Sequence, residues 1–411
     1  MTPTLNGSKL SRTYSITPDT RLFENLGATG QPAYKAIAEF TDNSVDNRIA
    51  GERVSVNINY KVKNNKIAKI VIEDDASGMT EEELVKAFTI GHSSKTDPKK
   101  IGRFGMGLKT AISSLGNSWT VTTATKDCKL GHQIVDNKKR LVESKDWSVS
   151  ISDVPKLLPI NKNFGTYIEI TQTEHLNATT FSRDLERNLG NLFRHFILDG
   201  TLILSINDNI VEAPTYEVID DSVKEINTVI NGKVVTGWLG LRTNGSVYYG
   251  FSLVRNNRVM EEEVKIGFQP HPSVNRIIGD IHLDDFSTDH HKTSFNKNTD
   301  DWAALVEYLT EEVKPIVEYA RKLSHKDNSH LTPLQEKKLN ETLNIFLNAI
   351  REDEILNQIN TGGIGSENEA INTSRTASEN GNTSSKLNDS PESNQTPQKK
   401  TIGPYSTLKI E

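Results

Sequence analysis

The chain of 411 residues has few of the features that mark several common protein classes. It contains a single cysteine, Cys128, which excludes a disulfide framework and any zinc module built from several cysteines. No stretch reaches the roughly 20 apolar residues that cross a bilayer. Residues 1–20 also lack the apolar centre of a signal peptide. We therefore expect a cytoplasmic protein that makes no contact with a membrane.

An excess of positive charge is also missing. The chain has 48 Lys and Arg against 54 Asp and Glu, so its net charge of -6 excludes a uniformly basic coat for nucleic acid or lipid. Its hydrophobic fraction of 35% is low, and the deficit is concentrated in residues 361–400, which are rich in Ser, Asn and Thr. Such a segment cannot offset its ordering entropy by burial. We predict that folded structure ends near Gln358 and that a disordered tail follows.

The length suggests two or three domains, at roughly 150 residues per domain. Strand-like runs interrupted by helical patterns predict an α+β fold for the first half, and short strands dominate residues 205–300. The expected strand runs are 54–60, 66–74, 119–125, 165–173, 234–241, 247–260 and 276–283. The expected divisions are an N-terminal arm at 1–15, a first domain at 16–204, a second domain at 205–300, a helical extension at 301–358 and a disordered tail at 359–411.

Two amphipathic helices are expected before the tail. Apolar residues recur at three- and four-residue steps from Trp302 to Leu323, with Pro315 as an expected kink. Thr332 and Pro333 predict the start of a second helix that continues to Ile350. These apolar stripes can pack on the chain itself or on a partner helix, and we favour the first.

An unusual polar stripe occupies the helix expected from Gln31 to Ile49. Glu39, Asp42, Asn43 and Asp46 share one side of it, and the stripe contains no Lys or Arg. A solvated helix face is the simple explanation. The unbalanced acidic character suits a cation and a water molecule better.

A second acidic feature follows the strand run 66–74. The strand ends in Asp74 and Asp75, turns through Gly78, and enters a helix near Thr80, whose first turn is acidic. A carboxylate at a strand end is well placed to accept a hydrogen bond from an exocyclic amine. The alternative is an ordinary capped turn, which explains Thr80 and Gly78 but not the paired aspartates.

Glycines cluster in IGRFGMGLKTAISSLG at 101–116, after GHSSK at 91–95. Gly102, Gly105 and Gly107 come just before a helix expected near Leu108, so backbone N–H groups can converge on phosphate oxygens. The segment does not satisfy the Walker A pattern, because Leu108 separates Gly107 from Lys109. It also does not satisfy the dinucleotide-binding pattern.

Taken together, these segments resemble the GHKL ATPases, the superfamily of gyrase, Hsp90, histidine kinases and MutL. Four boxes carry the resemblance in the family's order, over residues 15–200. They are Glu39-Phe-Thr-Asp-Asn43, Asp74-Asp-Ala-Ser-Gly78-Met79, Gly102-Arg-Phe-Gly-Met-Gly107 and Gly165-Thr166. The resemblance implies a Bergerat-type ATPase α/β sandwich. Residues 253–267 and 284–295 resemble the S5-like transducer domain that follows it, and the whole is most similar to the MORC family without its CW zinc finger.

The resemblance assigns roles to individual residues. Asp74 would bind the adenine amine, with Thr166 nearby, and Asn43 would coordinate Mg²⁺. Ala76 replaces the first glycine of the family's box, and alanine is still small enough to let adenine approach. The remaining cofactor-binding residues expected for ATP are Gly78 and Met79, Gly102, Arg103, Phe104, Gly105, Met106, Gly107 and Leu108 of the phosphate lid, and Lys95.

Two residues are expected to act in catalysis. Glu39 is one helical turn before Asn43, where a carboxylate can orient and deprotonate the attacking water. Its presence favours ATP hydrolysis over histidine phosphorylation. By resemblance, Lys292 reaches the γ-phosphate from the second domain.

The sequence thus predicts a Mg²⁺-dependent ATP hydrolase that acts as an ATP-gated dimeric clamp or switch, with DNA as the expected substrate. Lys61, Lys63, Lys66, Lys99, Lys100 and Arg103 supply local positive charge. An Hsp90-like chaperone or scaffold for protein clients remains open, as does a weakly hydrolysing module that only dimerises when it binds nucleotide.

Overall fold

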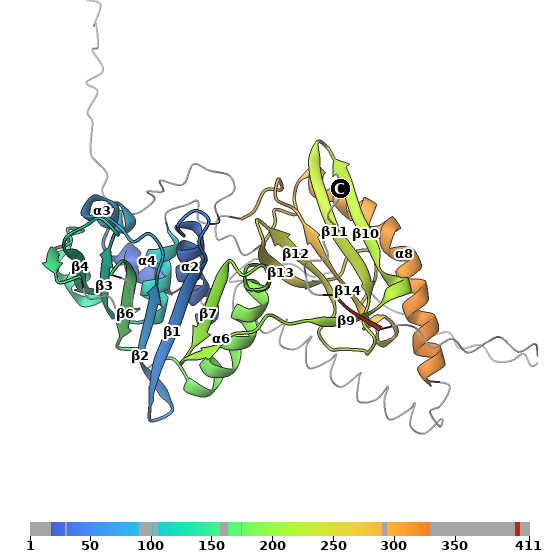
Figure 1. The fold of residues 1–411 in the computed structure, drawn as a ribbon, viewed down its shortest axis with the longest axis horizontal. Helices are drawn as coiled ribbons and strands as arrows, with labels where there is room; N and C mark the ends of the chain where they lie inside the picture. The colour runs from blue at the N-terminus through green and yellow to red at the C-terminus, as the bar shows by residue number, and fades with distance from the viewer. Residues whose placement is uncertain are drawn as a thin grey trace, which may run out of the picture.

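The computed structural model describes residues 18–28, 31–89, 101, 106–156, 163–173, 175–289, 294–328 and 399–402. These residues form two large β-sheets with helices packed beside them, one sheet in each half of the chain (Figure 1). The α+β class expected from the sequence is confirmed, and the two sheets agree with the expected ATPase sandwich followed by a transducer-like domain. No helix in these residues is long and apolar enough to span a membrane.

The first sheet has eight strands in the order β5-β4-β3-β6-β2-β1-β7-β8. Only the β1–β7 pair is parallel among those whose register is described. In β1 the buried residues alternate with partly exposed ones, so helices cover one face of this sheet. The strands are β1 (Val54–Lys63), β2 (Lys66–Asp74), β3 (Ser118–Ala124), β4 (Gly131–Asn137), β5 (Ile151–Val154), β6 (Gly165–Thr171), β7 (Leu202–Ile206) and β8 (Asn209–Ile210).

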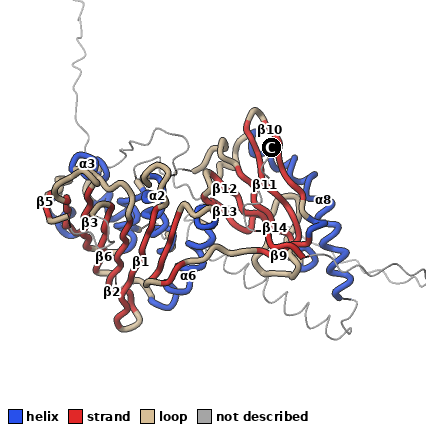
Figure 2. Tube along the Cα trace, viewed as in Figure 1, coloured by secondary structure: helices blue, strands red, loops and turns tan. Residues whose placement is uncertain are grey.

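The helices of this half share one hydrophobic core with the sheet. Phe23 stacks on Trp119 at 5.1 Å between ring centroids, and Phe181 meets Tyr60 edge to face at 5.1 Å. These contacts join helices to strands β3 and β1, and Figure 2 distinguishes the helices and strands of this half by colour. The helices are α1 (Arg21–Gly27), α2 (Ala33–Asp46), α3 (Glu81–Phe88), α4 (Gly107–Leu115), α5 (Lys138–Ser144), α6 (Ala178–Leu192) and α7 (Arg194–Leu198).

The second sheet has five strands in the order β10-β11-β14-β12-β13. The expected run 247–260 folds as a hairpin, because Asn256 and Asn257 adopt φ angles of 49° and 62° that turn the chain sharply. Its strands are β10 (Lys224–Ile230), β11 (Lys233–Leu241), β12 (Gly250–Arg255), β13 (Arg258–Val264) and β14 (Ile277–His282). Outside this sheet, the same half contains strand β9 (Tyr216–Ile219) and the 3₁₀ turns η1 (Asp220–Ser222) and η2 (Pro272–Val274).

The long helix α8 (Asp300–Asn328) packs on the second sheet. It buries Leu305, Leu309, Val313 and Ala320 in the same core as the strands. Packing on the chain itself, the favoured alternative, is therefore confirmed for this helix. Helix α8 shares one hydrophobic core with the strands that precede residue 300, where the division between domain and helical extension is expected. The second expected helix, from Thr332 to Ile350, lies outside the described residues.

One short segment of the expected tail is ordered. Strand β15 (Lys399–Ile402) pairs antiparallel with β9, with Lys399 opposite Ile219 and Ile402 opposite Tyr216. The expectation of a disordered tail is wrong at these positions. Pairing with an edge strand requires only backbone N–H and C=O groups, so a segment too polar to form a core can still join a sheet. Residues 359–398 and 403–411 lie outside the described residues.

Candidate nucleotide-binding site

Helix α2 carries the two residues expected at the centre of the chemistry. It begins directly after Pro32 and ends at Asp46. Glu39 and Asn43 are one turn apart and both partly exposed, whereas Phe40, Thr41 and Asp42 between them are buried. The helix therefore presents one carboxylate and one amide side by side at its accessible edge.

Polar contacts fix α2 against neighbouring segments. The Ser44 hydroxyl donates to Asp74 at 2.7 Å, and the Asp46 carboxylate accepts from the Ile101 amide at 2.8 Å. At the C-terminal end, the Asn47 carbonyl accepts from the Ser77 amide at 3.0 Å. Asn43 is thus flanked by residues whose positions are set by the end of β2 and by the segment that leads into the glycine cluster.

Asp74 lies at the end of β2 and accepts three hydrogen bonds. One oxygen accepts from Ser44, and the other accepts from the backbone amides of Ala76 and Thr166, each at 3.1 Å. Burial disfavours the ionised form and raises the pKa of Asp74 to about 6, against the opposing effect of these donors. A partly buried carboxylate whose pKa is raised in this way is typical of a binding site.

Thr123 on β3, which no sequence pattern predicts, joins Met79 to β6. Its hydroxyl accepts from the Met79 amide at 2.9 Å and donates to the Gly165 carbonyl at 3.0 Å. The Thr166 hydroxyl lies 3.3 Å away. Thr123 is fully buried. Nothing in its local sequence distinguishes it, because only the pairing of β3 with β6 brings it opposite Thr166.

The glycines of two boxes are required by close backbone packing. Gly78 has φ +68°, and a Cβ there would lie 2.0 Å from the Ala124 carbonyl oxygen. Gly165 has φ +119°, and its Cβ would meet the Asp74 carbonyl oxygen at the same distance of 2.0 Å. Ala76, which replaces a family glycine, is 3% exposed and packs in the first core. The departure at Ala76 is thus accommodated inside the protein.

Helix α4 begins at Gly107, beside Glu39. A Cβ on Gly107 would lie 2.0 Å from a Glu39 carboxylate oxygen, so a larger residue here would require the Glu39 side chain to move. Met106 provides no side-chain cap for the first N–H groups of α4, which is the arrangement that favours anion binding. Leu108 follows in the first turn. Lys109 is buried, and burial lowers its pKa to about 8.

The structure therefore brings together Glu39, Asn43, Asp74, Gly78, Met79, Gly107 and Thr166 around α2, the end of β2 and the start of α4. Met106 and Leu108 flank Gly107 in the chain. Other predicted site residues lie outside the described residues, namely Lys95, Gly102, Arg103, Phe104, Gly105 and Lys292.

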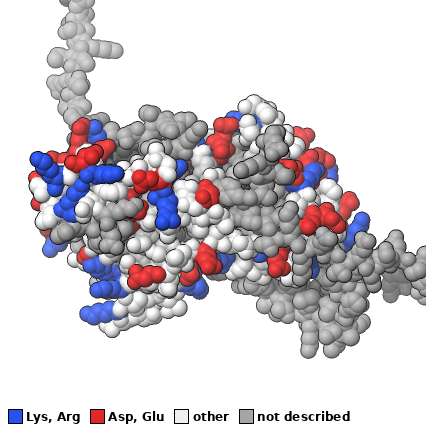
Figure 3. Space-filling view, in the orientation of Figure 1, with Lys and Arg blue, Asp and Glu red and all other residues white. Residues whose placement is uncertain are grey.

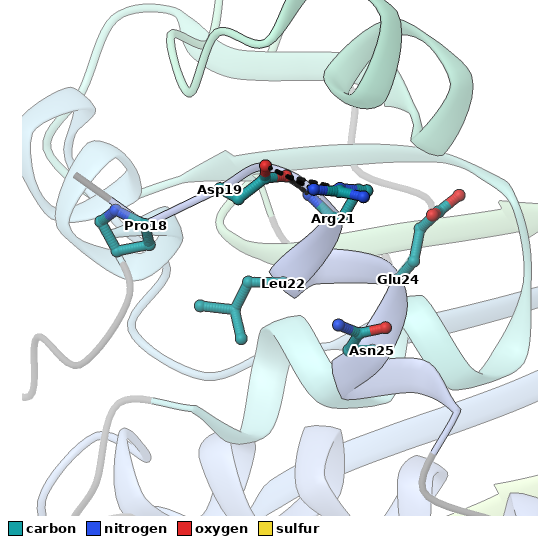
Figure 4. A pocket seen from close by; sticks show the side chains of 6 residues that line it. All are labelled: Pro18, Asp19, Arg21, Leu22, Glu24 and Asn25. Carbon is teal, nitrogen blue, oxygen red and sulfur yellow. Dashed lines mark hydrogen bonds and ion pairs between the residues drawn. The ribbon is translucent and has the colours of Figure 1, made fainter.

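Two hollows of the described surface lie away from these residues. The larger, of about 360 Å³, is lined by Pro18, Leu22 and neighbours on α1, with Asp19 and Arg21 paired at its rim (Figure 4). The smaller, of about 220 Å³, lies between α6 and the second sheet. Neither includes Glu39, Asn43 or Asp74, so neither marks the candidate site.

The side-chain oxygens of Asp74 and Asn43 fit the adenine amine and a phosphate-bound Mg²⁺, respectively. An ionised carboxylate offers about four acceptor positions. Asp74 uses three of them within the protein, which leaves one for an exocyclic amine. No cluster of three or more His, Cys, Asp or Glu able to hold a metal is present in the described parts of the chain. A metal here would take an amide oxygen from Asn43 and the rest of its ligands from phosphate and water, as Mg²⁺ commonly does.

Comparison with known proteins agrees with this geometry. Residues 31–162 match the family described as histidine kinase-, DNA gyrase B- and HSP90-like ATPases. Protein MICRORCHIDIA 3 of Arabidopsis thaliana is 41% identical over 86 residues, which are 21% of this chain and 14% of that protein. ATPase morc-1 of Caenorhabditis elegans is 38% identical over 88 residues, or 21% of this chain and 10% of its own length.

The resemblance to GHKL ATPases of the MORC type is thus confirmed. The matches with the two relatives cover only 14% and 10% of those proteins, so they bear on the ATPase domain alone.

Proposed function

We propose that this protein binds ATP with Mg²⁺ and hydrolyses it to ADP and phosphate. The observation that carries the proposal is the position of Glu39, one turn from Asn43 on α2 and against Gly107 at the start of α4. A carboxylate beside a helix N-terminus that binds phosphate is placed next to the site of attack. The ATPase family match over residues 31–162 supports the same reaction.

Each residue has one task in this scheme. Asp74 accepts from the adenine amine, and its contacts with Ser44 and Thr166 fix the orientation of the carboxylate. Asn43 contributes an oxygen to Mg²⁺, which would neutralise phosphate charge when bound. Glu39 orients a water molecule and takes its proton. The N–H groups at the start of α4 donate to phosphate oxygens.

Matched variants of α2 test the hydrolysis proposal. Glu39→Gln is expected to keep ATP binding within about threefold and to lower kcat by about 10²- to 10⁴-fold, the usual contribution of a general base. Asn43→Ala is expected to lose Mg²⁺-dependent ATP affinity, measured by calorimetry. Unchanged turnover in Glu39→Gln would contradict the role of Glu39, and a wild-type chain without Mg²⁺-dependent phosphate release would contradict the function itself.

The proposal extends to an ATP-gated dimer that closes on DNA in the cytoplasm. Lys61, Lys63 and Lys66 are exposed at the tip of the β1–β2 hairpin, where basic side chains gather (Figure 3). This group supports a local DNA contact in a chain whose net charge is -6.

Charge reversal of the hairpin tests the DNA contact. Replacing Lys61, Lys63 and Lys66 together by Glu should weaken DNA binding and reduce the salt slope, log Kd against log salt, by up to about 3. ATP hydrolysis without DNA should stay unchanged. Stimulation of hydrolysis by an unfolded protein, together with indifference to DNA, would favour a chaperone in place of a clamp. A lack of mass change on adding a non-hydrolysable ATP analogue would contradict ATP-gated dimerisation.

A further inference from the structure

A buried ion pair connects the ATP-site helix to the second sheet. Arg258, the first residue of β13, donates from Nε to both carboxylate oxygens of Asp42 on α2, at 2.7 and 3.0 Å. The side chains are 9% and 3% exposed. The two residues are 216 positions apart in the chain. Asp42 immediately precedes Asn43, so this contact acts on the turn that carries the proposed site.

Arg258 is itself firmly placed. Its Nη1 donates to the Val259 carbonyl at 3.0 Å, and its guanidinium lies 5.5 Å from the centre of the Phe193 ring. Phe193 is buried in the first core, just before α7. An arginine held on one side by its own strand and on the other by an aromatic face loses little further freedom when it pairs with a carboxylate. It can therefore set the position of Asp42.

Net stability alone does not explain the pair. Burying two charges costs about as much desolvation free energy as their attraction returns, so apolar residues would serve equally well for docking. A second pair, Arg194–Asp280, already joins the two halves, with a nitrogen–oxygen distance of 2.5 Å and side chains 0% and 2% exposed. Removing Arg258 consequently leaves another interdomain contact in place.

We propose that Arg258 is a positioning residue for ATP hydrolysis, which holds Asp42 and thereby sets the place of Glu39 and Asn43 on α2. This inference rests on the proposed function. On the far side of Asn43, Ser44 is fixed by Asp74 at 2.7 Å, from within the first domain. The residues on either side of Asn43 are thus held by different halves of the protein. A shift of the second sheet would move the helix turn that carries the chemistry.

The test separates positioning from stability with full-length variants. Arg258→Gln removes the cation and is expected to lower kcat by about 10- to 100-fold, the cost of a misplacement of about 1 Å. The Kd for ATP should change by less than about threefold. Arg258→Gln will also lower the unfolding temperature, because it removes the cation that pairs with a buried carboxylate. The double variant Asp42→Asn with Arg258→Gln removes both charges and should recover the unfolding temperature but not kcat.

Two controls complete the design. Arg140→Gln breaks an ion pair within the first domain, in which Arg140 donates to Asp136 at 2.6 Å, and should leave kcat unchanged. Arg258→Lys keeps the charge and should recover part of kcat.

The inference is overturned if kcat recovers together with the unfolding temperature in the double variant, or if folded Arg258→Gln turns over like the wild type. A wild-type chain that binds but does not hydrolyse ATP would instead overturn the proposed function.

Discussion

The candidate ATP site and the junction between the two sheets both hold carboxylates that are at least partly buried, but the hydrogen-bond and ion-pair partners of these carboxylates differ. At the junction, Asp42 and Asp280 each meet an arginine. At the site, Asp74 receives only hydroxyl and amide donors, and its pKa rises to about 6. A carboxylate that pairs with an arginine holds two parts of the fold together, whereas one without a cation keeps an acceptor position for a ligand. The comparison separates structural acids from binding acids.

The largest expected effect comes from breaking the junction. Arg194→Gln would leave Asp280, 2% exposed, as an unpaired buried charge, and should lower the free energy of unfolding by about 3–5 kcal/mol. Chemical denaturation at pH 7 measures it. Arg183→Gln is the matched control, since the Arg183–Asp184 pair is exposed and its loss should change stability by less than about 1 kcal/mol. Equal losses in the two variants would show that the junction pair is no more structural than a surface pair.

Asp74→Asn should raise the free energy of unfolding at pH 7, whereas Arg194→Gln should lower it. The folded-state pKa of about 6 lies above the ordinary 3.8, so the ionised carboxyl costs stability at pH 7. The amide removes that cost, and we expect a gain of about 1–3 kcal/mol in the free energy of unfolding at pH 7. As pH falls from 6 to 4 the wild type protonates and the difference should disappear. ATP binding should be lost. A less stable Asp74→Asn would contradict the assignment of Asp74 as a binding acid.

Gly107→Ala tests the contact between Glu39 and α4. The added Cβ would lie 2.0 Å from the Glu39 carboxylate and must displace it. Turnover should fall by about 10- to 100-fold, while stability changes by less than about 1 kcal/mol because alanine favours the helix. Ser114→Ala, near the other end of α4, is the control and should keep turnover. Full activity in Gly107→Ala would show that the position of Glu39 is not critical.

The smallest expected effect is the pH dependence of ATP affinity. Protonation of Asp74 near pH 6 removes an acceptor for the adenine amine, so the Kd for ATP should rise by about tenfold between pH 7 and pH 5. Titration calorimetry across this range measures it. GTP, which presents a carbonyl oxygen in place of the amine, should not lose affinity over the same range. A flat profile for ATP would place adenine away from Asp74.

Local patterns were sufficient to predict most elements of the fold. The helix from Gln31 to Ile49 forms as Ala33–Asp46, and Thr80 with Glu83 forms a capping box at the start of α3. Those features depend on residues within one or two turns of each other. The polar stripe on α2 contains no basic residue of its own. Its cation is Arg258 on β13, which pairs with Asp42 and lies far away in the chain.

The sequence by itself determined the order of the boxes, the ATPase fold and the identity of Glu39, Asn43 and Asp74 as candidates, because each depends on neighbouring residues and recognisable spacing. Only the tertiary structure decided the pairing of Asp42 with Arg258 and the role of Thr123 opposite Thr166. It also placed β15 on β9. These contacts join residues far apart in the chain. Their geometry arises from sheet pairing and domain docking, which no local pattern encodes.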